Sequence, residues 1–310
     1  MHMLGRLLPL VLLLLPPAEP AVADEPVIQQ LETGCINWSA AVVQAKGRST
    51  PAEADAERST DASTARLDAA RQAAVGNILE TVAAIRIDAT ARVSSRMAAA
   101  SSFREGLVNL ARNATPIRQE YLSDGTLEIE LSMPLTGGFA QFVLPAEIRQ
   151  VDTVTATVSA HPSPDNLPQG EKNGTTGTHT GLILNAIGIG AQPALAPLVV
   201  DETGEVVYGP AFVSREYAVS QGMSGFSTTL AAARENIRRV GERPMVIKAI
   251  RTDARGSSAL VIANTDAARL RSSAAYLCFL KACRVCIVLG PPPPPVTSPD
   301  PAPIPSDGDE

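Results

Sequence analysis

The sequence contains few of the residue types on which most catalytic and ligand-binding sites depend. Aromatic residues make up 4% of the 310 residues, with a single Trp, and there are three His and four Cys. Sugar-binding sites usually stack on Trp or Tyr, so this scarcity argues against a carbohydrate-binding protein. The sequence has no H-E-x-x-H or comparable metal-ligand spacing, and we therefore predict neither a metal centre of this kind nor a cofactor.

The chain also lacks an excess of basic residues. Its formal net charge is -6 at pH 7, and no basic stripe interrupts this mild acidity. Nucleic-acid-binding proteins concentrate positive charge on one surface, so nucleic acid is not an expected partner. Apolar residues reach 45% of the chain, which is enough to build a substantial core.

The only long apolar run lies at residues 7–15, and it is too short to span a bilayer. Arg6 precedes the run, and Ala21 and Ala23 fit the two positions that signal peptidase reads. Residues 1–23 therefore predict a secretory signal peptide, and the residue that follows is not the cysteine of a lipoprotein. We expect a protein of the periplasm or a secreted protein, without a transmembrane segment once the signal is removed.

The first half of the chain, residues 32–138, predicts a module with the order β-α-β-(α)-β-β. Apolar residues at spacings of three and four indicate an amphipathic helix, and Asp124-Gly125 indicates a hairpin turn. The helical stripe consists of Leu67, Ala70, Ala74, Ile78 and Val82. The expected elements are strands at 36–45, 85–93, 117–122 and 127–133, and helices within 52–82 and 96–111.

Residues 139–178 are rich in Pro and Gly and predict a linker or long surface loop. Residues 179–289 predict a second module, and residues 290–310 a disordered, Pro-rich acidic tail. The fold class is therefore α+β, with two small modules, each a short, mostly antiparallel sheet packed with Ala-rich helices. In the second module we expect strands at 182–187, 198–200, 206–208, 245–250, 259–263 and 284–289, and helices at 227–238 and 264–280.

Three patterns resemble catalytic motifs, and each is better explained as ordinary structure. The two histidines beyond the leader, His161 and His179, flank the polar loop and are the candidates for acid–base catalysis. Ser224 lies in a sequence similar to a nucleophile elbow, but the second Gly comes one position early, which favours a plain tight turn. Gly188-Ile-Gly190 resembles a dinucleotide-binding loop, but a Pro occupies the third glycine position and would stop the required helix.

The four cysteines suggest disulfides, because an even number in an oxidising compartment favours bridges. Cys283 and Cys286 are poor mutual partners on a strand, since they would lie roughly 10 Å apart whereas a disulfide needs Cα atoms within about 7 Å. We expect Cys278 to pair with Cys283, and Cys35 with Cys286. A zinc site formed by all four is the alternative, although a second C-x-x-C motif is missing.

Several short motifs resemble a bacterial secreted lipoprotein-like family related to the N-terminal domain of flagellar assembly protein T. The motifs are Ile36-Asn37-Trp38, Ala45-x-Gly47, Ala69-Ala70, Ala73-Ala74, Asn77-Ile78-Leu79-Glu80, Asp124-Gly125-Thr126, Met133-Pro134-Leu135, Gly181-Leu-Ile183, Pro193-Ala-Leu-Ala-Pro197 and Val207-Tyr208-Gly209. The resemblance covers most of residues 34–289. It implies an envelope-associated α+β module with no established enzymatic residues, and it implies flagellar assembly for one branch of the family.

These observations together predict an exported, non-enzymatic envelope protein that acts as a structural or assembly module through protein–protein contacts. The expected partners are envelope proteins or further copies of the chain. The alternative is a periplasmic small-ligand-binding or hydrolytic protein that uses the loop at 161–179. A ligand site requires a pocket with convergent polar groups, whereas an assembly module requires an apolar patch or an open strand edge.

Overall fold

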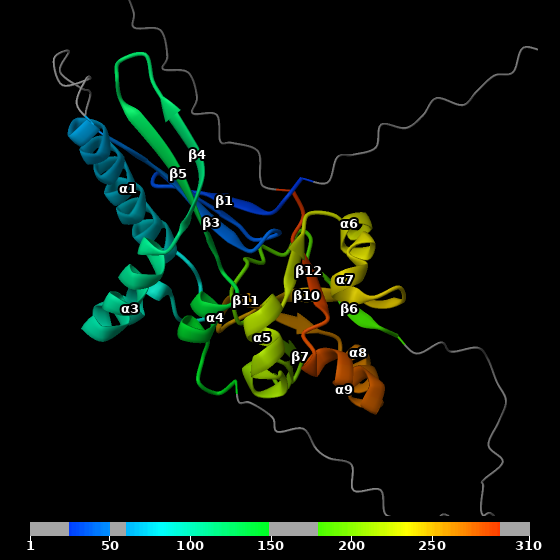
Figure 1. Cartoon of the computed structure of the whole chain (residues 1–310). Coiled ribbons are helices and arrows are strands. Elements are labelled where there is room, and N and C mark those ends of the chain that lie inside the picture. Colours follow the sequence, from blue (N-terminus) through cyan, green and yellow to red (C-terminus); the bar gives the residue numbers. More distant parts are fainter. Residues whose placement is uncertain (1–24, 50–59, 149–178, 292–310) are drawn as a thin grey trace, which may run out of the picture.

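The computed structural model describes residues 25–49, 60–148 and 179–291, which form two β-sheets with helices packed on them (Figure 1). The expected signal peptide, His161, most of the expected linker and the tail beyond residue 291 lie outside the described residues. Among the helices that the structure describes, none combines the length and apolar character needed to cross a membrane.

The first sheet is antiparallel throughout, as expected, and has the strand order β1-β2-β3-β5-β4. Its strands are β1 (Ile28–Gln30), β2 (Cys35–Asn37), β3 (Val42–Arg48), β4 (Thr115–Tyr121) and β5 (Leu127–Pro134). The strand expected at 36–45 is in fact two strands, β2 and β3. A turn containing Ala41 at a φ of 53° separates them.

Helix α1 (Thr60–Ala83) covers one face of this sheet. Its predicted stripe is confirmed at Ala70, Ala74, Ile78 and Val82, which are buried, whereas Leu67 stays partly exposed. Small residues let the helix approach closely, because Gly47 of β3 lies directly under the α1 backbone. Alternate residues of β3 therefore face α1, and the residues between them form the open face of the sheet.

Three shorter helices complete the first half: α2 (Val93–Ala99), α3 (Ser101–Arg112) and α4 (Gly138–Val143). The helix expected at 96–111 thus begins earlier and is interrupted at Ala100. Helix α4 lies where the linker was expected to begin, and Phe139, Ala140 and Val143 of this helix are buried, as is Ile148 beyond it. Arg215 fixes this segment by donating hydrogen bonds to the carbonyl oxygens of Gln141, Pro145 and Ile148.

The second sheet has seven strands in the order β8-β7-β11-β10-β6-β12-β9. Its pairing is mixed, which corrects the expectation of a mostly antiparallel sheet. Among the strand pairs that the structure describes in this sheet, β7–β8 and β10–β11 are antiparallel and the other four are parallel. The strands are β6 (Gly181–Asn185), β7 (Leu198–Asp201), β8 (Val206–Tyr208), β9 (Gly225–Ser227), β10 (Pro244–Asp253), β11 (Gly256–Ile262) and β12 (Val285–Val288).

The helices of this half are shorter than the sequence predicts, because polar residues interrupt them. The expected helix at 227–238 is divided at Asn236, which caps the second piece, and the helix expected at 264–280 is divided at Ser272 and Ser273. The helical elements are η2 (Pro210–Phe212), α5 (Arg215–Gln221), α6 (Leu230–Glu235), α7 (Ile237–Val240), α8 (Asn264–Arg271) and α9 (Ala274–Lys281).

One hydrophobic core extends across both sheets. Residues 85–93, expected to be a strand, form a single bridge between Arg86 and Arg92 and connect the two halves instead. The carbonyl oxygens of Arg86 and Ile87 accept hydrogen bonds from the backbone N–H groups of Leu195 and Ala196, at 3.0 and 2.7 Å. The α+β class is therefore confirmed, with the two sheets sharing a core.

Candidate functional site

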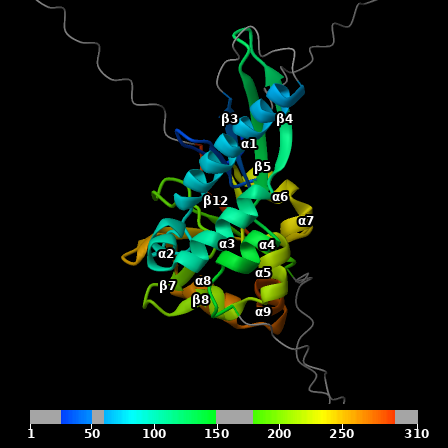
Figure 2. The same ribbon diagram turned by 60° about the vertical axis from the view of Figure 1, so that its left-hand side comes forward.

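The β4–β5 hairpin (residues 115–134), which we call the arm, projects away from the second sheet (Figures 1 and 2). Within the described residues β4 is one of the two edge strands of the first sheet, the other being β1, and it pairs with β5 on one side. Two large apolar residues near its ends are exposed, Ile117 at 49% and Tyr121 at 62%. A strand edge carries backbone groups that another strand can pair with, so the arm meets the expectation for a contact surface.

The turn at the tip of the arm is built by the predicted Asp124-Gly125 pair. Gly125 adopts a φ of 78°, and the Asp124 carboxylate accepts a hydrogen bond of 2.9 Å from the backbone N–H of Thr126. This hydrogen bond is the main reason why the pKa of Asp124 is lowered. Local turn chemistry therefore fixes the register that places Tyr121 opposite Leu127.

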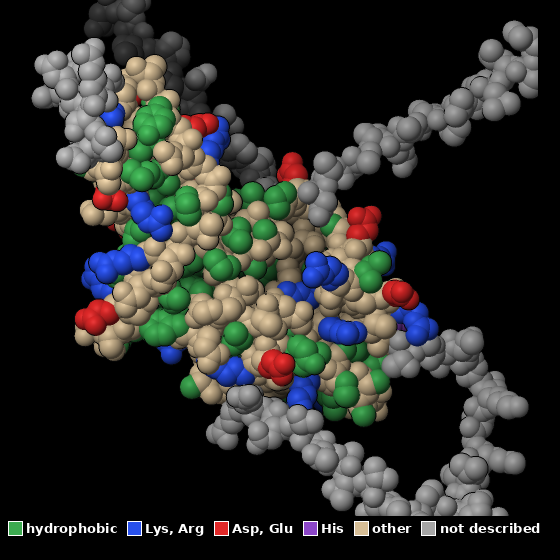
Figure 3. All heavy atoms as spheres, viewed as in Figure 1, with side chains coloured by type: hydrophobic (Ala, Val, Ile, Leu, Met, Phe, Trp, Pro, Cys, Tyr) green, Lys and Arg blue, Asp and Glu red, His purple; other side chains and the backbone are tan. Residues whose placement is uncertain are grey.

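The space-filling view shows hydrophobic side chains reaching the surface over the projecting part of the molecule as well as over its body, interspersed with charged groups (Figure 3). On β4 itself, Arg118 and Glu120 separate the two apolar residues and form an ion pair, with 2.8 Å between Arg118 Nε and Glu120 Oε1. The edge thus carries both apolar and charged side chains. Protein interfaces also combine the two, with apolar side chains at the centre and polar ones at the rim.

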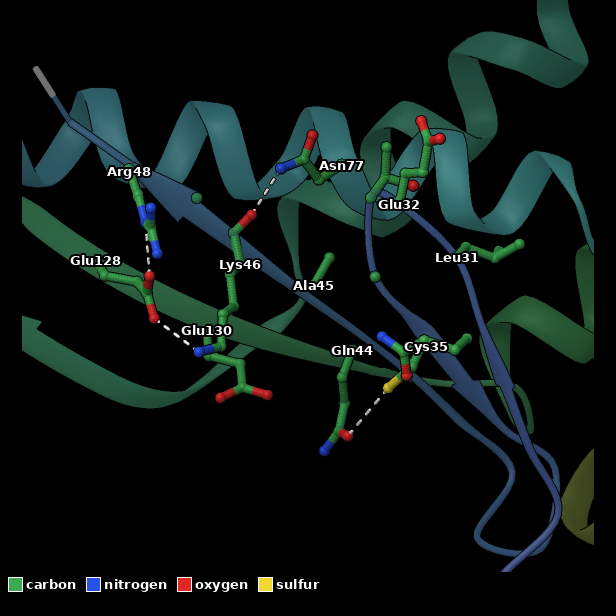
Figure 4. A pocket seen from close by; sticks show the side chains of 14 residues that line it. Leu31, Glu32, Cys35, Gln44, Ala45, Lys46, Arg48, Asn77, Glu128 and Glu130 are labelled. Atoms are coloured by element: carbon green, nitrogen blue, oxygen red, sulfur yellow. Dashed lines mark hydrogen bonds and ion pairs between the residues drawn. The ribbon is translucent and has the colours of Figure 1, made fainter. Parts of the chain in front are cut away.

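The open face of the first sheet carries a row of charged side chains across β3 and β5 (Figure 4). Glu128 is buried and receives Lys46 Nζ and Arg48 Nε on its two oxygens, each at 2.7 Å. The hydrogen bond from Lys46 and then that from Arg48 lower the pKa of Glu128, against the opposing effect of burial. A carboxylate held between two cations stays ionised and is poorly placed to transfer a proton.

A cavity of about 430 Å³ opens beside this row, between the β1–β2 turn and strands β3 and β5. Cys35 lies in its wall, 3.7 Å from the amide oxygen of Gln44. Burial, and then the nearby Glu130, raise the pKa of the Cys35 thiol, so it is not an activated nucleophile. Two of its polar groups are held by the sheet and its helix, because Lys46 binds Glu128 and Asn77 donates to the Lys46 carbonyl oxygen at 2.7 Å.

The disulfide pairs expected from the sequence are Cys278 with Cys283 and Cys35 with Cys286. Cys35, Cys278 and Cys283 are free thiols, so neither expected bridge is formed, and both pairings stay predictions. Cys283 packs in the core shared by the two sheets, whereas Cys286 belongs to the separate cluster under α6 and α7. The two members of the C-x-x-C motif thus pack in different clusters.

His179 lies at a groove of about 490 Å³ on the second half of the chain. One ring nitrogen of His179 lies 3.3 Å from the carbonyl oxygen of Arg243, and the other lies 3.3 Å from Arg269 Nη2. The ring also packs beside Tyr276, with 5.8 Å between centroids. Arg243 and Arg284 line the same groove, so its charge favours an anionic group.

The remaining motif candidates have structural roles. Ser224 is buried, its hydroxyl makes no hydrogen bond within the described residues, and it lines a small cavity of about 30 Å³. Its turn leads into β9 rather than into a helix, contrary to the sequence-based expectation of a helix at 227. Gly188 and Gly190 have φ values of 80° and 70° in the loop after β6. Over the described residues, three or more potential metal ligands do not gather anywhere.

The second half of the chain matches a known family model. Residues 181–291 match a family model described as Treponema pallidum Tp0624, second domain, and this range contains all seven strands of the second sheet. A search of curated proteins found no match to the chain. The resemblance to the family related to flagellar assembly protein T gains no support from these comparisons and stays a prediction.

Proposed function

We propose that this chain is an exported, non-enzymatic protein of the cell envelope that works through protein–protein contacts made by its arm. One observation carries the proposal: β4 is a seven-residue edge strand with Ile117 and Tyr121 exposed along it. Edge strands normally carry protection against pairing, and an unprotected apolar edge favours a docking role.

The backbone features that block pairing on β4 are confined to the start of the strand. Pro116 cannot donate a backbone hydrogen bond, and a register irregularity follows between Pro116 and Arg118. From Arg118 to Tyr121 the pairing with β5 is regular, which leaves this part of the edge straight enough to accept another strand. Tyr is also enriched at the centres of protein interfaces, where it supplies both apolar area and a hydroxyl.

The surroundings of the polar side chains Glu128 and Ser224 support an assembly role over a catalytic one. Glu128 is held by two cations, and Ser224 is buried beside a small cavity. Export rests on the expected leader at 1–23, and a role in surface or flagellar assembly rests on the resemblance alone.

A deletion strain complemented with variants of the arm tests the proposal. Complementation with Tyr121→Asp should fail to restore envelope integrity, surface appendages or the composition of envelope complexes, because a charge is placed on the contact edge. The matched control is Tyr217→Asp on α5, where the Tyr is also exposed, at 44%. Full activity of Tyr121→Asp, or one accumulated metabolite with intact assemblies in the deletion strain, would refute the proposal.

The alternative of a small-ligand-binding protein is supported by the groove at His179. Arg243 and Arg284 line this groove over an apolar floor that includes Phe279, an arrangement suited to a small anion. Calorimetric titration with acetate and with inorganic phosphate tests it, using Arg243→Ala and Arg284→Ala as variants. Saturable binding that both variants abolish would favour this function, and no heat of binding would exclude these anions.

A further inference from the structure

We propose that β4 pairs antiparallel with β4 of a second copy of this chain, which joins the two first sheets edge to edge in a two-fold dimer. The proposal names the partner of the arm and therefore rests on the function proposed above. The order of residues 117–121 along the edge supports this dimer. When two copies of this segment run antiparallel, each side chain meets one of complementary charge or character.

A two-fold axis through such a strand pair places one residue opposite its own copy. With Arg118 at the axis two guanidinium groups face each other, and with Glu120 at the axis two carboxylates do. Like charges directly opposite destabilise a strand pair, so both registers are disfavoured. With Gln119 at the axis, Arg118 of each copy lies opposite Glu120 of the other.

The Gln119 register also matches the other side chains of the edge. It places Ile117 of one copy opposite Tyr121 of the other, and pairs of an aromatic with a β-branched residue stabilise antiparallel strands. Both side chains are exposed in the isolated chain, so pairing would remove apolar surface from water. The two copies of Gln119 meet at the axis, where each amide offers both a donor and an acceptor.

The ion pair within β4 is preserved and doubled by this arrangement. Arg118 and Glu120 are 57% and 42% exposed, so neither charge is committed to the interior. In the dimer Arg118 and Glu120 of the two copies surround the two-fold axis, with unlike charges as neighbours. Each Arg118 guanidinium then contacts the Glu120 carboxylate of its own chain and that of the other copy. Electrostatic complementarity of this kind selects the register and the partner more than it adds affinity.

The shape of the molecule leaves room for the second copy. The arm projects from the body, and β4 runs outward towards the turn at its tip (Figures 1 and 2). Antiparallel pairing centred on Gln119 therefore places the two bodies at opposite ends of the joined strands. Pro116 then lies opposite Leu122, at the margin of the paired segment, where its missing N–H costs least.

Charge-reversal variants of the full chain, analysed by sedimentation equilibrium, test the proposal. The wild type should show a monomer–dimer equilibrium at micromolar concentrations. Arg118→Glu and Glu120→Arg should each weaken self-association at least about tenfold, since each sets like charges against each other. The double variant R118E/E120R restores complementarity and should dimerise as the wild type does.

A mixture of the two single variants provides the sharpest outcome. Arg118→Glu opposite Glu120→Arg pairs unlike charges at both positions, so an equimolar mixture should form a heterodimer although each variant alone stays monomeric. This result cannot arise from misfolding of either variant. Arg238→Glu and Glu235→Arg, at exposed positions on α7 and α6, are the charge-matched controls and should leave the equilibrium unchanged.

A wild type that stays monomeric, or a dimer that the edge charges do not affect, would overturn the proposal. These failures remain distinct from failure of the proposed function. If Tyr121→Asp abolishes complementation while the wild type is monomeric, the arm has a different protein as its partner. If Tyr121→Asp complements fully, the arm is not the functional surface.

Discussion

Trp38, in the turn between β2 and β3, packs edge-on against Phe226 of β9, with 5.6 Å between ring centroids and 74° between ring planes. Both rings are buried, and the next residue, Ser39, donates a hydrogen bond of 2.8 Å to the Phe226 carbonyl oxygen. The turn that divides β2 from β3 therefore anchors the first sheet on strand β9. An aromatic contact at this position ties the two halves into one core.

The first prediction is that Phe226→Ala destabilises the whole described body. Removing the ring leaves a cavity against Trp38, and such truncations of buried Phe cost about 3–5 kcal/mol. Because both halves share the core, thermal unfolding should remain a single transition at a lower temperature. Phe212→Ala, which truncates an exposed Phe, is the control and should have little effect. Two separate transitions in Phe226→Ala would show that the halves unfold independently.

The second prediction compares two glycines at the contact of α1 with β3. A Cβ built on Gly47 would lie 2.1 Å from Ala74 N and 2.3 Å from the Ala70 carbonyl oxygen, so Gly47→Ala must push the helix off the sheet. We expect a loss of several kcal/mol in the free energy of unfolding, in the upper range for a single substitution, above about 4 kcal/mol.

Gly76 in the same helix is the matched control, because a Cβ there meets nothing within 4 Å. Gly76→Ala should stabilise the protein by up to about 1 kcal/mol through helix propensity. Urea unfolding followed by circular dichroism measures both variants. Equal effects of the two substitutions would contradict the close approach of α1.

The features that the sequence predicted correctly depend on short-range patterns. The stripe of Ala70, Ala74, Ile78 and Val82 follows helical periodicity, and Asp124-Gly125 meets the backbone requirements of a tight turn. The α+β class follows from counting such local elements. Each of these signals is contained within a few residues, so no knowledge of the rest of the chain is needed.

The features that could not be predicted from the sequence depend on contacts between segments that are far apart along the chain. Ile85 and Ile87 alternate with polar residues as in a strand, but the backbone of Ile85 bonds to nearby residues, Val82 and Val93. The carbonyl oxygens of Arg86 and Ile87 instead accept hydrogen bonds from residues 195–196, far along the chain. The parallel pairs around β6 likewise arise from crossovers that no local pattern records. For the same reason the strand at 117–122 was predicted, but its position at the edge of the sheet, which makes it the candidate site, was not.

The third prediction concerns Arg239, a half-buried arginine that donates to the carbonyl oxygens of Gln221, Gly222 and Cys283. Burial lowers the pKa of its guanidinium, against the opposing influence of Tyr208, Cys283 and Cys286. Arg239→Met would leave the three carbonyl groups without this donor and should cost about 3 kcal/mol.

Arg238 is the adjacent control, because it is exposed. Arg238→Met should change stability by less than about 0.5 kcal/mol. Chemical denaturation of the two variants in parallel separates the hydrogen-bonding role from the general effect of removing a positive charge. A neutral Arg239→Met would show that water replaces the guanidinium at these carbonyl groups.

The fourth prediction concerns the C-x-x-C motif. Cys283 follows α9 with a φ of 56°, and it is buried, which raises the pKa of its thiol to about 11. In the reduced, folded chain it should react with iodoacetamide at least about 100-fold more slowly than the exposed Cys278. Time-resolved alkylation with mass spectrometry measures the ratio.

Non-reducing peptide mapping of the exported chain complements this experiment. Because Cys283 and Cys286 pack in different clusters, we expect no bridge between them. The map also tests the expected Cys278–Cys283 and Cys35–Cys286 pairings. Finding a 283–286 disulfide would mean that the start of β12 is folded differently.

The last prediction is a pH dependence that comes from Asp201 at the end of β7. Its carboxylate accepts hydrogen bonds from the hydroxyl and backbone N–H of Thr203 and from the backbone N–H of Glu205, and it forms an ion pair of 2.9 Å with Arg271. The hydrogen bond from the Thr203 hydroxyl is the largest influence, and burial opposes it. The pKa of Asp201 falls from 3.8 to about 2.

A carboxyl group whose pKa is lower in the folded state stabilises that state above its unfolded pKa. The contribution of Asp201 should therefore be complete above pH 3.8 and should be lost as the pH falls from 3.8 to about 2. Asp201→Asn keeps the shape but cannot ionise, so it should melt below the wild type at pH 6. The difference between their melting temperatures should shrink steadily between pH 4 and pH 2, because protonation makes the wild-type side chain equally neutral. Melting curves across this range measure it, and a difference that does not change with pH would show that Asp201 acts through its shape rather than its charge.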